Sequence, residues 1–370
     1  MALSPQLEER LTRLATALVD QERARVIVPP QQSSTGFWFG GGNMVEAADG
    51  TLFVTGRYRN FGDSRTGLGS GERGLELAIF ESSDGGETWQ KAVSFSKPEL
   101  NVGDRSVLSI EGTALHIGPD GVELFVSTEK DGIGYPGGLE GYLKPGAGVW
   151  TIERLSAPTV AELKDAAIET IIECHDPRWL HIKDPFVFEQ RNGDLDVLFC
   201  SHPFCWSSSN TGFVRRSAGQ GGYSEPDYDF FPRGTTWDVA MTRGTAVVNV
   251  PQVGAFADQD VSLVFYDGGE CLRNLDEHST AVKRPRGYSC EEIGGAAYIQ
   301  NGDLSSVERL SKHAPFFISP RGTGCSRYVD VLTTKDGRMI ATWQQSQDDC
   351  SQPLVMNALS AVEIEEFLSN

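Results

Sequence analysis

The sequence Glu81-Ser82-Ser83-Asp84-Gly85-Gly86-Glu87-Thr88-Trp89 begins directly after an apolar run, residues 75–80. Its Asp-Gly-Gly core supplies the positive φ angles that a tight turn needs, and the Asp84 carboxylate can accept hydrogen bonds from nearby backbone N–H groups. Thr88 and Trp89 are residue types that favour a returning strand, with the indole folding over the turn. The stretch therefore predicts a β-hairpin.

This stretch resembles the Asp-box of sialidase-like β-propellers, Ser-x-Asp-Gly-Gly-x-Thr-Trp, at each of its fixed positions. The resemblance implies a propeller in which the box joins the outer strands of one blade. That place lies away from the axis, where propellers bind their ligands. The motif therefore predicts a fold and assigns no site residue.

A strand, a turn and a second strand recur along the chain. The clearer copies are residues 43–54, 113–126, 185–199 and 328–343, and a looser copy is 237–250. Their turn glycines lie about 72 residues apart on average, at Gly50, Gly121, Gly193, Gly244 and Gly337. Five such repeats fill the chain, and each has room for four short strands. We predict an all-β, five-bladed β-propeller; the alternative is a six-bladed sialidase-type propeller.

The two ends of the sequence predict how the ring closes. The last repeat shows only three strands, around 328–333, 338–345 and 353–359. Residues 24–29 form a β-branched segment ahead of the first blade. We expect this segment to supply the missing outer strand of the last blade, because ring closure removes an exposed sheet edge.

An amphipathic helix is predicted ahead of the propeller. Leucines recur there at helical spacing with charged residues between them, at positions 7, 11, 14 and 18. We expect residues 1–22 to form this helical segment, packed against the outside or the bottom of the ring. No linker-like or low-complexity segment interrupts the repeats, so residues 23–370 are predicted to be one propeller domain.

Composition excludes some partners. Lys and Arg total 32 against 51 Asp and Glu, so the net charge is −19, which disfavours nucleic acid and an anionic membrane as partners. No apolar run is long enough to span a bilayer, and the N-terminus lacks the apolar centre of a secretory signal. The seven scattered cysteines suit a reducing compartment better than a disulfide framework. We expect a cytoplasmic protein, and the oligomeric state stays open.

The axis of the predicted propeller is the expected place for chemistry. The residue at the head of each innermost strand should point toward the central cavity. These heads are Asn43, Glu111, Asp184, Asp238 and the pair Arg327/Asp330. Glycosidic cleavage needs two carboxylates, one a proton donor and the other a nucleophile or base. The predicted ring offers three or four carboxylates at its centre.

Lys183-Asp184-Pro185 resembles the Arg-Asp-Pro element of the five-bladed furanosidase families, the invertase/fructosidase and arabinanase/xylosidase group. The resemblance implies that Asp184 stabilises an oxocarbenium-like transition state by binding ring hydroxyls. The chain departs from the pattern at Lys183, where the families have Arg. It also lacks the Asn-Asp-Pro-Asn and Glu-Cys elements that mark invertases.

Further carboxylates and aromatic residues complete the predicted site. Glu111 interrupts an apolar strand and precedes Gly112, as close backbone approach to a ligand would require. Asp238 is a third carboxylate candidate, and the adjacent Trp237 offers a stacking face for a sugar ring. Glu292, beside Glu291, is a candidate general acid. Asp330 and Tyr328 are expected to bind substrate.

Residues 200–205, Cys-Ser-His-Pro-Phe-Cys, contain metal-binding residue types. Their spacing matches no common zinc site and no second cysteine pair completes it, so we expect no metal at this stretch. We expect no cofactor, and whether a metal binds at the axis stays open. His202 and Trp206 are predicted instead to be substrate-binding residues on a loop.

Arginines are concentrated early in the sequence, at positions 57, 59, 65 and 73, and Arg327 lies in the neighbouring last blade. Sialidases grip a carboxylate with three arginines, because a planar guanidinium forms two parallel charge-assisted hydrogen bonds. Arg57, Arg73 and Arg327 could form such a cluster. We therefore predict a glycosidase that trims terminal residues from short oligosaccharides, with neutral and anionic sugars both open. The alternatives are a sialidase proper, a uronate lyase that uses His202 and Tyr328, and a non-catalytic sugar-binding propeller.

Overall fold

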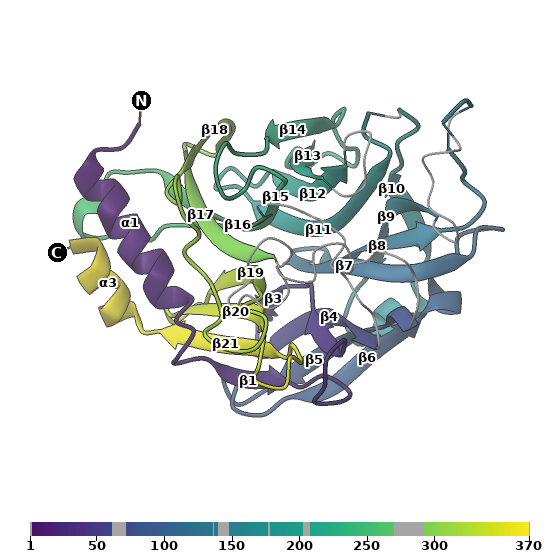
Figure 1. Cartoon of the computed structure of the whole chain (residues 1–370), viewed down its shortest axis with the longest axis horizontal. Helices are drawn as coiled ribbons and strands as arrows, with labels where there is room; N and C mark the ends of the chain where they lie inside the picture. Colours follow the sequence, from purple (N-terminus) through teal and green to yellow (C-terminus); the bar gives the residue numbers. More distant parts are fainter. Residues whose placement is uncertain are drawn as a thin grey trace.

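The computed structural model describes residues 2–60, 72–135, 137–139, 148–176, 178–202, 208–269 and 292–369, without the side chains of residues 72 and 73. Within these ranges the strands form five antiparallel sheets arranged as a ring (Figure 1). The predicted five-bladed propeller is therefore confirmed, and the six-bladed alternative is wrong.

Each blade is one sheet, whose strands follow one another from the inside of the ring outward. The first contains β2 (Trp38–Gly40) and β3 (Met44–Glu46), both paired with β4 (Leu52–Asn60), then β5 (Glu72–Ser82) and β6 (Gln90–Ser96). The second contains β7 (Val107–Gly118), β8 (Gly121–Lys130), β9 (Val149–Ala157) and β10 (Ile168–Ile172). The third contains β11 (His181–Glu189), β12 (Leu195–His202), β13 (Asn210–Arg216) and β14 (Asp227–Phe231). The fourth contains β15 (Met241–Asn249), β16 (Val261–Gly269), β17 (Ile293–Gln300) and β18 (Asp303–Arg309).

The fifth blade closes the ring with strands from both ends of the sequence. Its order is β19 (Ser326–Thr333), β20 (Met339–Gln345), β21 (Leu354–Leu359) and β1 (Arg25–Val28). Arg25 pairs with Met356 and Val26 with Val355, and Figure 1 shows β1 alongside β21. The predicted closure is confirmed, and it gives the last blade a fourth strand from the start of the sequence.

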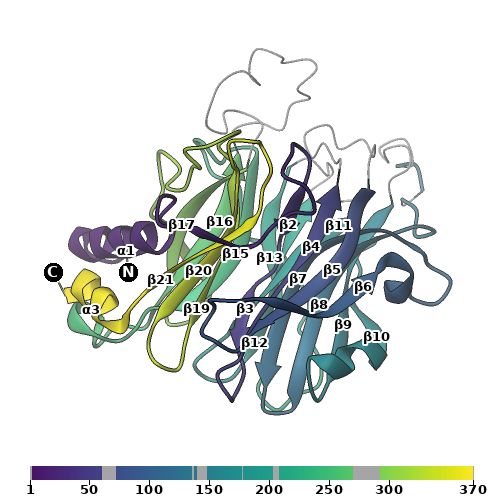
Figure 2. The same ribbon diagram turned by 90° about the horizontal axis from the view of Figure 1, so that it is seen from below.

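Two helices pack together beside the last blades (Figure 2). Helix α1 (Pro5–Leu18) starts at Ser4, whose hydroxyl accepts the Leu7 N–H, and its buried face carries Leu11, Leu14 and Leu18. It packs on α3 (Ala361–Ser369) and on apolar residues of blades four and five. No helix in the described ranges is both long and apolar enough to cross a bilayer.

The hairpin predicted at residues 81–89 joins β5 and β6. One oxygen of Asp84 accepts the Ser82 hydroxyl at 2.7 Å and the Thr88 N–H at 2.9 Å. The indole N–H of Trp89 donates to the carbonyl of Gly86, which adopts a φ of +96°. The turn is therefore held by its own side chains, which explains why so short a stretch predicts its own conformation.

The repeat predicted at residues 237–250 was given its turn at the wrong position. β15 runs through Gly244 without turning, and the reversal toward β16 lies farther on, at the 3-10 helix Gly254–Phe256. A Cβ atom on Gly244 would lie 2.7 Å from the Phe186 ring. This glycine therefore allows close packing between two blades rather than a turn.

Ring closure by β1 leads to a test with a matched control on the same strand. Val28 is fully buried, whereas Val26 is 51% exposed. We expect Val28→Asp to lower the free energy of unfolding by at least about 3 kcal/mol, because its carboxylate would be buried without a partner. Val26→Asp should change it by less than about 0.5 kcal/mol. Urea unfolding measures both, and equal effects would contradict closure through β1.

Candidate active site

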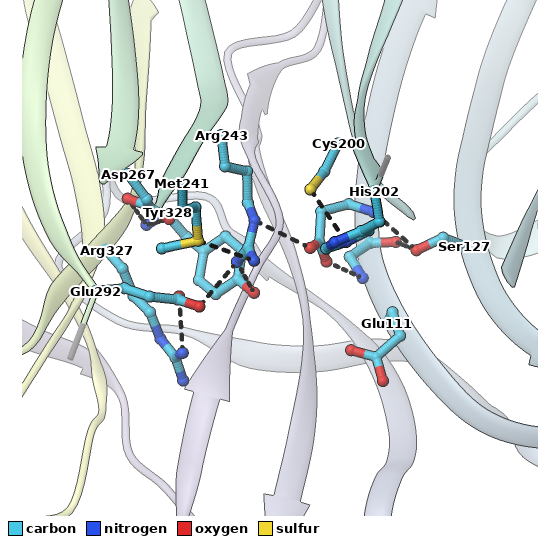
Figure 3. Close-up of polar contacts among 12 residues, drawn as sticks. Glu111, Ser127, Cys200, His202, Met241, Arg243, Asp267, Glu292, Arg327 and Tyr328 are labelled. Atoms are coloured by element: carbon cyan, nitrogen blue, oxygen red, sulfur yellow. Dashed lines mark hydrogen bonds and ion pairs between the residues drawn. The ribbon is translucent and has the colours of Figure 1, made fainter. Parts of the chain in front are cut away.

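Four inner strands break their pairing register near the centre of the ring. The breaks lie at residues 110–113 of β7, 183–186 of β11, 244–246 of β15 and 327–330 of β19. A β-bulge turns a side chain out of the regular alternation of a strand. The side chains in or beside these breaks converge on one cluster (Figure 3): Glu111, Asp184, Arg243 and Tyr328.

Two of these residues have a strained backbone. Asp184 has a φ of +54° and Tyr328 a φ of +53°, in the left-handed region that costs a non-glycine residue about 1–3 kcal/mol. The Asp184 N–H donates to the Ser127 hydroxyl at 3.0 Å, and Asp184 Oδ1 accepts the Gly112 N–H at 3.0 Å. Neighbouring strands therefore fix the strained conformation and the direction of the Asp184 carboxylate.

Three carboxylates and three guanidinium groups alternate in a continuous series, which we call the axial ion-pair chain: Glu111, Arg57, Asp184, Arg243, Glu292 and Arg327. The successive N–O distances along it are 3.2, 3.8, 3.5, 3.1 and 2.8 Å. None of these side chains is more than 15% exposed. Ion pairs so deeply buried interact much more strongly than pairs on a surface.

Two aromatic rings lie between the arginines. The Tyr328 hydroxyl accepts hydrogen bonds from Arg57 at 3.3 Å and Arg243 at 3.1 Å. The indole of Trp38 lies 4.7 Å from the Arg57 guanidinium and 4.9 Å from that of Arg327. Cations over aromatic faces are stabilised by the ring quadrupole. The rings therefore allow like charges to be held close together.

Two glycines make room for the cluster. A Cβ atom on Gly41 would lie 1.7 Å from a terminal nitrogen of Arg57, and one on Gly112 would lie 2.5 Å from the Asp184 Cα. Gly112 was predicted to allow close approach of a ligand. It allows close approach of Asp184 instead, and donates its N–H to that side chain.

The electrostatics keep both glutamates ionised. Burial alone would raise the pKa of Glu111, but the charges of Arg57, Lys183 and Arg59 together outweigh it and lower that pKa to about 2. Burial opposes ionisation of Glu292 as well, and Arg243 and Arg327 lower its pKa to about 2. Both groups are therefore carboxylates at neutral pH, which suits a nucleophile, a base or a stabiliser of positive charge.

The structure brings together six of the twelve predicted site residues. They are Glu111, Asp184, Glu292, Arg57, Arg327 and Tyr328. His202 lies beside the cluster on β12 (Figure 3). Its Nδ1 contacts the Ser208 carbonyl at 2.8 Å. Burial lowers the pKa of His202 well below its usual value, so the ring is neutral. Among the described residues no group of three or more His, Cys, Asp or Glu side chains could hold a metal ion.

Asp238 and Trp237 lie away from the cluster. Because β15 begins at Met241, Asp238 precedes the strand, and its carboxylate binds Arg309 at 2.7 Å. The Trp237 indole stacks on Tyr266 and donates to the Ser311 carbonyl. Both residues therefore belong to the packing of blade four, and the structure does not bring them together with the other predicted site residues.

Asp330 links two blades of the ring. Its carboxylate accepts the Met44 N–H at 2.8 Å and so ties β19 to the first blade. Burial raises the pKa of Asp330 to about 7. Of the other predicted residues, the side chain of Arg73 and all of Trp206 and Glu291 lie outside the described residues.

Two residues of the cluster, Arg243 and Trp38, were not predicted from the sequence. Arg243 is the axial residue of blade four, but Arg243-Gly244 was interpreted as a turn. Arg243 could have been recognised from a pattern that it shares with Glu111: each is a charged residue followed by a glycine inside an apolar strand. Trp38 lies in a short strand before the first clear repeat, and nothing in its local pattern indicated contact with the arginines.

No known family model matches the sequence, and no curated protein matches it. Solved structures match nearly the whole chain. The α-L-arabinofuranosidase of Lactobacillus brevis aligns over 90% of this chain and 91% of its own, at 11% identity and a TM-score of 0.56. A thermostable family-43 glycoside hydrolase aligns over 89% and 91%, at 10% identity and 0.53. The α-L-arabinanase of Penicillium chrysogenum, complexed with arabinobiose, aligns over 92% and 98%, at 10% identity and 0.50.

The fold is that of the five-bladed glycoside hydrolases. At identities of 10–12% the similarity extends to the arrangement of the strands. A shared fold assigns no chemistry, which depends on the residues that this chain places at the axis.

Proposed function

We propose that this protein is a glycoside hydrolase that removes terminal sugar residues and that its chemistry takes place at the axial ion-pair chain. One observation carries the proposal: separate blades bring the carboxylates of Glu111, Asp184 and Glu292 into one buried cluster. Hydrolysis of a glycosidic bond uses a pair of carboxylates around an oxocarbenium-like transition state. The arabinofuranosidases and arabinanase that share the fold are consistent with this function.

Asp184 is suited to stabilise the transition state. Its Oδ1 is fixed by Gly112, whereas its buried Oδ2 has no hydrogen-bond partner among the described residues. Arg57 and Arg243 lie 3.8 and 3.5 Å from the carboxylate and keep positive charge on both sides of it. This oxygen makes no hydrogen bond, although Arg243 Nε lies 3.5 Å from it, so it can accept one from a sugar hydroxyl or stabilise the developing positive charge of the ring.

Glu111 and Glu292 divide the acid and base roles. The ion pairs of Glu292 with Arg243 and Arg327 measure 3.1 and 2.8 Å, whereas that of Glu111 with Arg57 is longer, at 3.2 Å. The ion pair of Glu111 is therefore the easier one to break before the carboxylate takes up a proton. We assign Glu111 as the general acid, once bound substrate separates it from Arg57. Glu292 stays ionised and serves as nucleophile or base.

Replacement of Asp184 tests this function. Asp184→Asn keeps the shape of the side chain and removes its charge, so kcat/KM should fall by a factor on the order of 10³, about 4 kcal/mol of transition-state stabilisation. The assay measures release of the aryl group from a panel of aryl glycosides that includes an arabinofuranoside, a xyloside and a sialoside.

Asp196→Asn is the matched control. Asp196 is a buried aspartate on β12 that pairs with Arg215, outside the cluster. The control should retain kcat/KM within about threefold of the parent once its folded fraction is equalised. An Asp184→Asn variant within tenfold of the parent would contradict the assignment of the site.

A second candidate is a glycosidase for anionic sugars. The observation that favours it is the meeting of three guanidinium groups, those of Arg57, Arg243 and Arg327, around the Tyr328 ring. Arg243 takes the place that was predicted for Arg73. A sugar carboxylate could compete with Glu292 for these groups, because an arginine binds carboxylates through two parallel hydrogen bonds.

Arg327→Lys distinguishes the two candidates. If the substrate is anionic, the change should lower kcat/KM at least about 100-fold, and parent activity should fall steeply with added salt, because lysine lacks the planar fork and salt screens the attraction. If the substrate is neutral, the loss should stay below about tenfold and the parent should be insensitive to salt. Efficient, salt-sensitive cleavage of a sialoside would establish the anionic candidate.

A further inference from the structure

Asp184 and Tyr328 occupy equivalent places in blades three and five. Each is the first residue inside a register break of an inner strand, and their φ values differ by only one degree. A residue within such a break loses its regular ladder partner, so its N–H needs another acceptor. Each of these two N–H groups finds one on the second strand of the preceding blade.

The two acceptors correspond in position and differ in chemistry. In blade two, the Ser127 hydroxyl on β8 accepts the Asp184 N–H at 3.0 Å. In blade four, both carboxylate oxygens of Asp267 on β16 accept the Tyr328 N–H, at 3.0 and 3.1 Å (Figure 3). Asp267 pairs across its own blade with Arg243 in the strand register. The same structural device therefore serves both strained residues.

Asp267 is fully buried, and the only hydrogen bonds of its side chain in the described ranges are those from the Tyr328 N–H. The positive charges of Arg243 and Arg327 also act on its carboxylate. Burial and the nearby charge of Glu292 raise the pKa of Asp267 well above its usual value. Burying an acid at this position costs stability, so we expect the Asp267 side chain to contribute through the backbone N–H that it binds.

Tyr328 is the group that depends on it. A buried N–H without an acceptor costs about 1–3 kcal/mol, and the left-handed conformation costs a similar amount. Without Asp267, the backbone at Tyr328 should relax to a negative φ. That rotation would move the hydroxyl away from Arg57 and Arg243, to which it is now bonded.

We propose that Asp267 is a positioning residue that holds Tyr328 in its strained conformation and so keeps the hydroxyl between the arginines of the axial ion-pair chain. The effect expected on turnover rests on the proposed glycosidase function. The effect expected on the conformation of Tyr328 does not, because it can be observed without any substrate.

Three substitutions separate positioning from simple burial of an acid. Asp267→Asn and Asp267→Ser each retain an oxygen that can accept the Tyr328 N–H, and the serine copies Ser127. Asp267→Ala removes the acceptor. Asp196→Ala, which deletes a buried aspartate outside the cluster, is the control for loss of packing and charge.

Crystal structures of the variants give the first measurement. In Asp267→Ala, Tyr328 should leave its positive φ and its hydroxyl should lose the hydrogen bond to Arg243. Asp267→Asn, Asp267→Ser and Asp196→Ala should keep both features. A Tyr328 that stays in place in Asp267→Ala, or that moves in Asp267→Ser as far as in Asp267→Ala, would overturn the proposal.

Kinetics on whichever aryl glycoside the parent cleaves gives the second measurement. Asp267→Ala should lower kcat at least about thirtyfold, and Asp267→Ser should restore it to within about fivefold of the parent. Tyr328→Phe combined with Asp267→Ala should be no slower than Tyr328→Phe alone, because both act through one hydroxyl. Additive losses would overturn the proposal. Failure to cleave any glycoside would overturn the glycosidase function and leave the crystallographic test valid.

Discussion

The axial ion-pair chain is the interaction on which the rest of the structure depends. Removing charged groups from water costs several kcal/mol for each ion, and burial is tolerated only when each charge finds partners with good geometry. In this cluster every carboxylate lies within 4 Å of an arginine and each guanidinium lies within 4 Å of a carboxylate. Loss of any one member would leave a buried charge with fewer partners, so these groups act as a unit.

The propeller fold supplies the geometry that the axial ion-pair chain requires. The inner strands of separate blades meet at the axis. In four of them, a register break turns a side chain toward the side chains of the neighbouring blades. Gly41 and Gly112 remove the Cβ atoms that would occupy the space of Arg57 and Asp184. Closure of the last blade by β1 and the contact from Asp330 to Met44 join the two ends of the ring. A precise cluster therefore results from five separate sheets.

Sequence patterns could predict what depends on local chemistry. The Asp84 turn is held by its own side chains, and the strand–turn–strand spacing fixed the number of blades and the role of residues 24–29. Glu111 was recognised because it interrupts an apolar strand, and Asp184 because it stands at the head of a strand in a Lys-Asp-Pro element. The prediction failed where a residue has two local interpretations: Gly244 resembles a turn glycine but allows packing against Phe186. That one error moved the blade-four site from Arg243 to Asp238. The roles of Trp38 and Asp267 depend on neighbours distant in sequence, and no local pattern carries them.

The central claim is that the axial carboxylates act directly on a sugar. A crystal structure of the Asp184→Asn variant soaked with an aryl glycoside that the parent cleaves tests it most directly. We expect a sugar ring in the cluster, with a hydroxyl within about 3.2 Å of the residue 184 side chain and the glycosidic oxygen nearest to Glu111. A ligand bound elsewhere on the propeller, or one in the cluster without contact to residue 184, would contradict it.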